Sequence, residues 1–253
     1  MRHGFWLKVA LIGLVGGVVA LIACASGEQV ENSPTTPDEL KTRILEWAEG
    51  APSKVQLQGE GQDRPLPFRH YGEGGLPVLL QIEAGQPFPG PILYDGSSHY
   101  IRPTEDGAGL RAGQWIEVPQ QLLQGDAGRR ELGDLVDSLT WFWIFDPLTL
   151  LRASDPVGEL APVEEGSSLS YKGRVVVENL RTSVPSGLDE NALSNADGWE
   201  VEVTAGVDGA ITEFTLRAKL DTNFSYTVPW ERTDTEPQIP DDVVSFERFL
   251  EAQ

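Results

Sequence analysis

Cysteine, methionine and histidine are scarce in this sequence. Its 253 residues contain one cysteine, Cys24, one methionine and three histidines. A single cysteine excludes an intrachain disulfide and a multi-thiolate metal site. His70 and His99 lie in predicted strands without an Asp, His or Cys partner at ligand spacing, so we expect structural or surface roles and no metal site.

Basic residues are also few relative to acidic ones. The chain has 19 Lys and Arg against 39 Asp and Glu, and its formal net charge is -20. Such a surface repels nucleic acid and anionic lipid headgroups, so nucleic acid is excluded as a partner. The hydrophobic content of 40% is ordinary and predicts a folded core.

Motifs of catalysis and cofactor binding are missing from the sequence. It contains no G-x-S-x-G elbow, Walker loop, dinucleotide fingerprint or zinc-ligand pair. The many carboxylates alternate with apolar residues along predicted strands, as on a solvated sheet face. We therefore expect a protein that is not an enzyme and that uses no cofactor.

The N-terminus has the features of an export signal. Two basic residues precede an apolar run at residues 9–23, which at about 15 residues is shorter than the roughly 20 that span a bilayer as a helix. Leu21-Ile22-Ala23-Cys24 resembles the bacterial lipobox. Residues 1–23 are therefore predicted to be a lipoprotein signal peptide, and Cys24 the site of lipidation. The alternative is a signal anchor in which Cys24 is only a small apolar residue.

A lipidated Cys24 would hold the protein to a membrane through two or three acyl chains, outside the cytoplasm and in the cell envelope. The residues after it, 25–37, are polar and contain no aromatic side chain, so residues 24–37 are predicted to be a flexible tether. Residues 38–253 are long enough for one large domain or two small ones.

The hydrophobic pattern predicts the order of helices and strands in residues 38–253. A helix follows Thr36, with Pro37 at its first position, and period-2 strands occupy most of the chain to residue 118. Helical spacing returns in residues 132–151, where Asp146 is expected to cap a second helix. Four long strands and a short terminal helix complete the chain.

The first of the four long strands is predicted to carry Leu169, Tyr171, Val175 and Val177 on one face. We predict an α+β fold in which one large curved antiparallel sheet has helices against its inner face, because this explains the element order better than two independent domains.

Several segments resemble the LppX/LprG-type envelope lipoproteins of actinobacteria (LppX/LprAFG) and, more distantly, the LolA and LolB lipoprotein carriers. The resemblance covers most of the chain after Cys24 as an order of elements with short motifs. These are the opening helix, residues 94–100 followed by residues 113–118, residues 146–151, a strand at residues 171–180, a loop at residues 185–192 and a hairpin at residues 203–216.

This resemblance implies a half-barrel of antiparallel strands whose concave face, covered by helices, encloses an apolar cavity for acyl chains. It implies binding and carriage of envelope lipids without chemistry, with an envelope transporter as a possible partner. The acidic extension from Glu231 onward departs from the family pattern, because it is longer than the expected ending.

The aromatic run in residues 139–145 is the best candidate for contact with a ligand. Four large aromatics in five positions cannot share one helix face, so some must meet a cavity, a lid or a partner. The alternative is that they fill a core between helices and sheet. The predicted cavity residues are Trp141, Phe142, Trp143, Phe145, Leu148, Leu151, Tyr94 and Trp115.

Two functions follow from these observations. The first is a lipid-anchored carrier or chaperone that shields a lipid or another amphiphile in an apolar cavity. The second is an interaction or sensor module of the cell surface that uses the same fold with a filled core. A continuous apolar void of several hundred Å³ would favour the first function, since a packed interior leaves almost none.

Overall fold

The computed structural model describes a large part of the chain. The described residues are 33–56, 68–72, 74–79, 90–103, 112–125, 130, 132–163, 168–219 and 223–251. The predicted signal peptide, the lipobox with Cys24 and most of the predicted tether lie outside them. Residues Thr36–Gln253 form one compact unit, and every element below belongs to it. Among the described residues, each helix is too short or too polar to cross a membrane.

The unit begins with helix α2, Pro37–Glu49, as predicted. The Thr36 hydroxyl accepts a hydrogen bond from Glu39 N at 3.2 Å, and Pro37 occupies the first turn, where its missing N–H is not needed. The helix ends at Gly50. Its apolar stripe is fully buried and consists of Leu40, Ile44 and Ala48.

A meander of short strands follows, and each strand pairs antiparallel with the next. The strands are β1 Ser53–Gln56, β2 Phe68–Tyr71, β3 Pro77–Leu79, β4 Ile92–Tyr94, β5 Ser98–Ile101 and β6 Trp115–Pro119. The short helix α3, Gln120–Leu123, continues from β6. Successive residues of β5 point to opposite faces, and all four are buried, so both faces of the sheet are covered here.

Two consecutive helices then interrupt the strands, which confirms the prediction from helical spacing. Helix α5 spans Asp134–Ile144, and helix α6 spans Pro147–Ala153. Asp146 caps α6, since its carboxylate accepts a hydrogen bond from Thr149 N at 2.7 Å.

The second half of the chain returns to the sheet. Its strands are β7 Ser154–Pro156, β8 Ala161–Pro162, β9 Ser168–Val175, β10 Glu200–Gly206, β11 Ile211–Lys219 and β12 Asn223–Arg232. The four long strands, β9 to β12, pair antiparallel in sequence order, as predicted.

The predicted continuation of β9 through Val177 to Leu180 is wrong. The strand ends at Val175, and helix α7, Val177–Ser183, follows it, before a second short helix, α8, Glu190–Ser194. β-branched residues favour a strand locally, but the Asp197 carboxylate accepts a hydrogen bond from Val177 N at 3.1 Å and the Leu180 side chain is fully buried. A distant acceptor and tertiary burial therefore override the local preference.

The β10–β11 hairpin turns at Asp208-Gly209, as predicted. Gly209 has φ of +89° and donates to Gly206 O at 2.9 Å. A Cβ at Gly209 would collide with the backbone of Arg43 on α2. This turn therefore requires glycine both for its left-handed backbone and for its approach to the helix.

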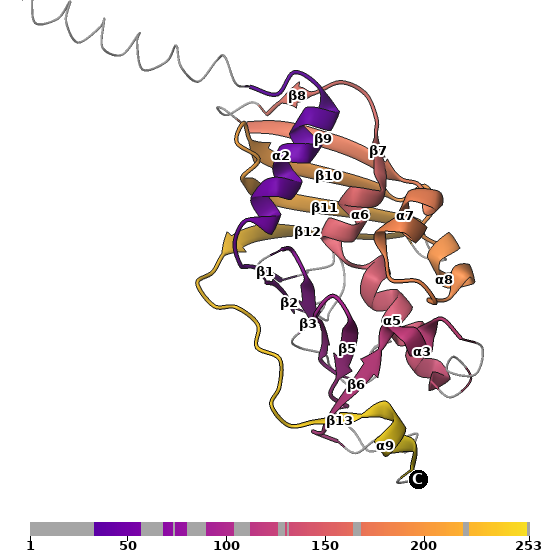
Figure 1. Ribbon diagram of the computed structural model, residues 1–253. Coiled ribbons are helices and arrows are strands. Elements are labelled where there is room, and N and C mark those ends of the chain that lie inside the picture. The colour runs from indigo at the N-terminus through magenta and orange to yellow at the C-terminus, as the bar shows by residue number, and fades with distance from the viewer. Residues whose placement is uncertain are drawn as a thin grey trace, which may run out of the picture. The chain divides into compact units, whose positions relative to one another are not determined.

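All strands belong to one 13-stranded sheet that curves without closing (Figure 1). Its order is β13-β6-β5-β4-β3-β2-β1-β12-β11-β10-β9-β7, and β8 also pairs with β9. The last strand, β13 Val243–Ser245, pairs parallel with β6 and leads into helix α9, Phe246–Glu251. The structure thus confirms an α+β fold with a large curved sheet of half-barrel form.

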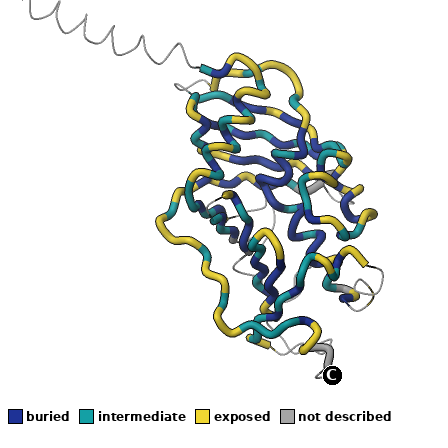
Figure 2. The backbone as a smooth tube through the Cα atoms, viewed as in Figure 1, coloured by how far each residue is buried: buried dark blue, intermediate teal, exposed yellow. Residues whose placement is uncertain are grey.

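The main core cluster lies between the concave face of this sheet and the helices. Buried residues recur along β9–β12 and along α5 and α6 (Figure 2). A second, smaller cluster lies on the opposite face of β3–β6, because alternate residues of each strand point outward there. It consists of Val78, Leu93 and Tyr100, with Trp115 and Val243 packed against it.

Candidate functional site

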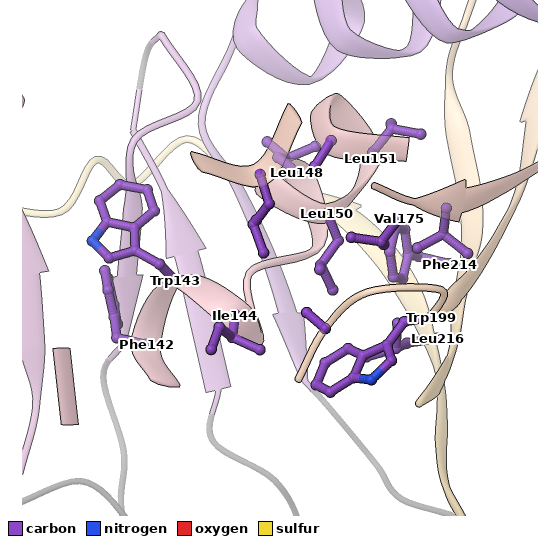
Figure 3. Packing of buried hydrophobic residues seen from close by; sticks show 14 of the residues in the cluster. Phe142, Trp143, Ile144, Leu148, Leu150, Leu151, Val175, Trp199, Phe214 and Leu216 are labelled. Carbon is purple, nitrogen blue, oxygen red and sulfur yellow. The ribbon is translucent and has the colours of Figure 1, made fainter. Parts of the chain in front are cut away.

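Seven of the eight predicted cavity residues come together where α5 and α6 face the concave side of the sheet. We call this region the helix–sheet interface (Figure 3). Phe142, Trp143, Leu148 and Leu151 are buried in the main core cluster, and Trp141, Phe145 and Tyr94 are partly buried against it. Trp115 is not part of this region, because it packs against the second cluster on the opposite face.

The aromatic run uses two sides of α5. Trp141 and Phe145 are four residues apart and stack with ring centroids 5.4 Å apart. Phe145 also contacts the buried Trp199 ring at 5.8 Å. Phe142 and Trp143 meet edge to face at 5.4 Å and point toward β5. The run therefore contacts two different regions of the sheet.

The junction of the two helices is held to the sheet by a buried ion pair. Arg69 Nη1 on β2 lies 3.3 Å from Asp146 Oδ1, and the two side chains are 1% and 0% exposed. Arg69 Nη2 donates to Phe142 O at 2.5 Å, and its guanidinium lies over the Phe142 ring at 4.7 Å. One arginine thus fixes both the end of α5 and the cap of α6.

Two tyrosines complete this buried polar group. The Tyr71 hydroxyl donates to Asp146 Oδ1 at 3.0 Å, and the Tyr226 hydroxyl donates to Phe145 O at 3.4 Å. Burial, and then the Asp146 charge, raise the pKa of Tyr71 well above its usual range. Burial also raises the pKa of Tyr226. Both tyrosines therefore stay neutral donors at physiological pH.

His99 and Trp143 form a second polar contact in the interface. Trp143 Nε1 donates to His99 Nε2 at 2.9 Å, and both side chains are buried. The network therefore assigns the ring proton of His99 to Nδ1. Burial lowers the pKa of His99 to about 3, although the Asp95 charge opposes the shift. His99 is thus a neutral residue at physiological pH.

Buried donors without a partner are the most unusual feature of this region. In the described part of the chain, four buried N–H groups have no hydrogen-bond acceptor, namely Arg69 Nε, His99 Nδ1, Trp199 Nε1 and Trp230 Nε1. The hydroxyls of Ser53 and Thr149 are also unpartnered. Native structures satisfy most buried polar groups, and an unsatisfied one costs about 1–3 kcal/mol.

The four donors lie beside three groups of aromatic rings. Phe142 contacts Arg69 on its face and His99 across a centroid distance of 6.3 Å. Trp230 stacks on Tyr71 at 5.0 Å, and Trp199 lies next to Phe145. The interface is thus apolar in its bulk and carries several buried donors.

Sequence reasoning missed Arg69, Tyr71, Trp199 and Trp230 as parts of the site. It identified Asp146 only as a helix cap and His99 only as a structural or surface residue. Arg69 and Tyr71 alternate along β2 and so share one face, which was a usable signal. The pairing of Arg69 with Asp146 gave no such signal, because the two residues are 77 positions apart in the sequence.

Comparison with known proteins gives distant similarities. No protein-family model and no curated protein sequence matches the chain. An uncharacterized conserved protein from Thermus thermophilus has a TM-score of 0.41 at 13% identity, over 82% of this chain and 98% of that one. The lipoprotein LppX from Mycobacterium tuberculosis has a TM-score of 0.34 at 10% identity, over 81% and 99%. Similarities this distant do not establish a function for this chain.

Within the described ranges, no group of three or more His, Cys, Asp or Glu side chains is placed to hold a metal ion. The Asp146 carboxylate is occupied by its hydrogen bonds to Arg69, Tyr71 and Thr149 N.

Proposed function

We propose that the unit binds a lipid or another amphiphile at the helix–sheet interface and carries it without chemical change. The observation that carries this proposal is the set of four unpartnered N–H donors, Arg69 Nε, His99 Nδ1, Trp199 Nε1 and Trp230 Nε1. All four donate, so the complementary ligand group is an oxygen acceptor such as a carbonyl or a carboxylate.

The donors favour a ligand because a purely structural core gains nothing from them. Each unsatisfied donor lowers stability by about 1–3 kcal/mol, whereas an apolar ring of similar size at the same position would avoid that loss. The remaining lining is aliphatic and aromatic, and an acyl chain gains roughly 25 cal/mol for each Å² of apolar surface that it buries there. The sequence resemblance to LppX/LprG-type lipoproteins points to the same activity.

A second candidate is an interaction or sensor module with a filled core. The observation that favours it is the full burial of Phe142, Ile144, Leu148, Leu150 and Leu151 at 0% exposure. Side chains packed this closely act as a core, so ligand binding requires the helix pair and the sheet to separate locally.

The test is native mass spectrometry of the protein purified from a lipid-containing host. We expect a co-purifying amphiphile on the wild-type chain. The double variant Trp199→Phe/Trp230→Phe removes two donors while keeping aromatic rings, and should bind the amphiphile at least tenfold more weakly. Trp47→Phe is the matched control, since Trp47 lies on α2 under Arg232 and should leave binding unchanged.

The alternatives give different results in this experiment. A wild-type chain that stays free of ligand even after incubation with extracted envelope lipids would favour the filled-core module. Equal binding by the double variant and the wild-type chain would show that the N–H groups of Trp199 and Trp230 do not contribute to ligand recognition. Circular dichroism of each variant checks that the fold is retained.

We also propose that Cys24 is lipidated and anchors the unit to the outside of a membrane. The lipobox-like residues 21–24 support this assignment, and an envelope transporter would be a natural partner for a carrier in that position. Mass spectrometry of the mature N-terminus should find an acylated cysteine, and Cys24→Ser should move the protein from the membrane fraction to the soluble fraction or leave it unprocessed. An unmodified Cys24 would contradict the assignment.

A further inference from the structure

A segment that follows β12 covers the β6 edge of the sheet. Residues 233–242 form no helix or strand and are largely exposed. They lead to β13, which pairs parallel with β6 through Val243–Trp115, Val244–Ile116 and Ser245–Glu117, and then to α9. We call residues 233–251 the C-terminal strap.

The strap packs against both faces of the sheet next to β6. Val243 packs against the second cluster, whereas Val244 packs against the main core cluster, because neighbouring residues of a strand point to opposite faces. All three residues of β13 are only half-buried. Phe246, at 2% exposure, is the one described side chain of α9 that is buried in the main core cluster. Among the described side chains of the strap, Phe246 is therefore the main buried anchor.

The opposite end of the sheet is covered more firmly. Helix α2 buries a complete apolar stripe there. Lys41 Nζ on its side donates to Arg152 O at 3.0 Å and to Ser154 O at 2.6 Å, and Arg43 Nη1 donates to Val207 O at 2.8 Å. By comparison, the strap contributes only the three residues of β13 and the six of α9 to regular structure, and its residues 233–242 are largely exposed.

Charge also opposes attachment of the strap. Its sequence contains six acidic residues, Asp234, Glu236, Asp241, Asp242, Glu247 and Glu251, and one basic residue, Arg248, on a chain with a net charge of -20. Like charges repel over about 10 Å at 0.1 M salt and over longer distances at lower salt. Detachment should therefore increase when the ionic strength falls.

We infer that the strap is a detachable cover and that its release gives an amphiphile access to the helix–sheet interface. Val244 and Phe246 cover the part of the main core cluster that contains Ile116 and Val118. When β13 and α9 separate from β6, this part becomes exposed. No other element has to unfold, since residues 233–242 already lie outside the sheet. Detachment of the strap does not depend on the proposed function, whereas the access route rests on it.

A cross-link between strap and sheet tests detachment. The full chain first receives Cys24→Ser, which removes its native cysteine. Glu117 and Ser245 are register partners across β6 and β13, so a disulfide between Glu117→Cys and Ser245→Cys locks the strap to the sheet. In the reduced protein, the β6 amides that face β13 should exchange hydrogen at least tenfold faster than those of β10. Oxidation should remove the difference, and low salt should increase it in the reduced form. Equal protection of β6 and β10 in the reduced protein would overturn detachment.

Uptake of a fluorescent probe, dansylated undecanoic acid, tests the access route. Locking the strap should slow uptake at least tenfold, reductant should restore it, and Phe246→Ala should accelerate it. Thr204→Cys/Glu213→Cys is the matched control, because it cross-links register partners of β10 and β11 far from the strap. Equal uptake rates in locked and reduced forms would overturn the access route but not the proposed function. No uptake by any form would overturn both.

Discussion

Single residues decide how the helix pair is attached to the sheet. Arg69 and Asp146 are both essentially unexposed and lie 3.3 Å apart. A buried charge is tolerated when it is paired and hydrogen-bonded, whereas removal of one partner leaves the other uncompensated. The attachment of α5 and α6 therefore depends on both members of this pair.

Removal of one member of this pair should destabilise the unit strongly. Arg69→Met keeps most of the side-chain volume but leaves the Asp146 charge without its guanidinium, so we expect a loss of about 3–5 kcal/mol in the free energy of unfolding. Urea unfolding monitored by fluorescence measures it. Arg152→Met, at the partly exposed pair with Glu49, is the control and should cost much less. Equal losses would show that the buried pair has no special role.

The double variant Arg69→Met/Asp146→Asn extends this test. It removes both charges, so it should be more stable than Arg69→Met alone if an uncompensated carboxylate causes the loss. A double variant less stable than either single variant would instead assign the loss to packing and to the α6 cap.

His99 makes stability depend on pH. Its pKa is about 3 in the folded protein and about 6.5 in an unfolded chain. Above pH 6.5 both states are neutral at this site and His99 adds no pH dependence. As the pH falls from 6.5 toward 3, the unfolded chain takes up the proton first, so the folded protein loses about 1.4 kcal/mol per pH unit from this residue.

Urea unfolding of the wild-type chain and of His99→Phe between pH 7 and pH 4 measures this contribution. The difference in unfolding free energy between the two proteins should change in favour of His99→Phe as the pH falls. The comparison isolates His99 from His70 and from the carboxylates, because these groups are present in both proteins. Parallel pH profiles would show that His99 titrates normally in the folded state.

At the scale of the elements, local signals predicted most helices and strands. The cap of α2, the restart of a helix at Asp146-Pro147 and the glycine turn at Asp208-Gly209 all depend on neighbours within a few residues. Helix α7 was missed because its first N–H group is accepted by a side chain 20 residues away.

This distant cap gives a prediction for α7. Asp197→Ala removes the acceptor of Val177 N, so α7 should lose about 1 kcal/mol of local stability. Asp197→Asn keeps an oxygen acceptor at the same place and should lose much less. Hydrogen exchange of the α7 amides distinguishes the two variants, with the α2 amides as an internal reference. Unchanged exchange in Asp197→Ala would mean that burial of Leu180 alone holds the helix.

At the scale of the whole molecule, the excess of acidic residues opposes the compact state. The formal net charge of -20 produces self-repulsion that salt screens, so stability should increase with ionic strength. Urea unfolding in about 20 mM and about 500 mM sodium chloride, two conditions with very different screening lengths, measures the effect. Sodium sulfate at the same ionic strength separates screening from ion-specific effects. A stability that falls with salt would show that the ion pairs outweigh the repulsion.

The sequence by itself determined most of the elements and the class of fold. Period-2 and period-3.6 patterns follow from which side of a strand or helix is buried, and they are visible within short stretches of chain. The eight residues that it assigned to a cavity stay a prediction. The prediction of lipidation at Cys24 comes from sequence alone.

Only the tertiary structure decided which residues meet across the sheet. The Arg69–Asp146 pair, the contact of Trp143 with His99 and the unpartnered donors join segments far apart in the chain. Trp115 shows the same limit, since a shift of one residue in a strand moves a side chain to the opposite face. Partners of this kind depend on strand order and register, which long-range packing selects and local patterns do not specify.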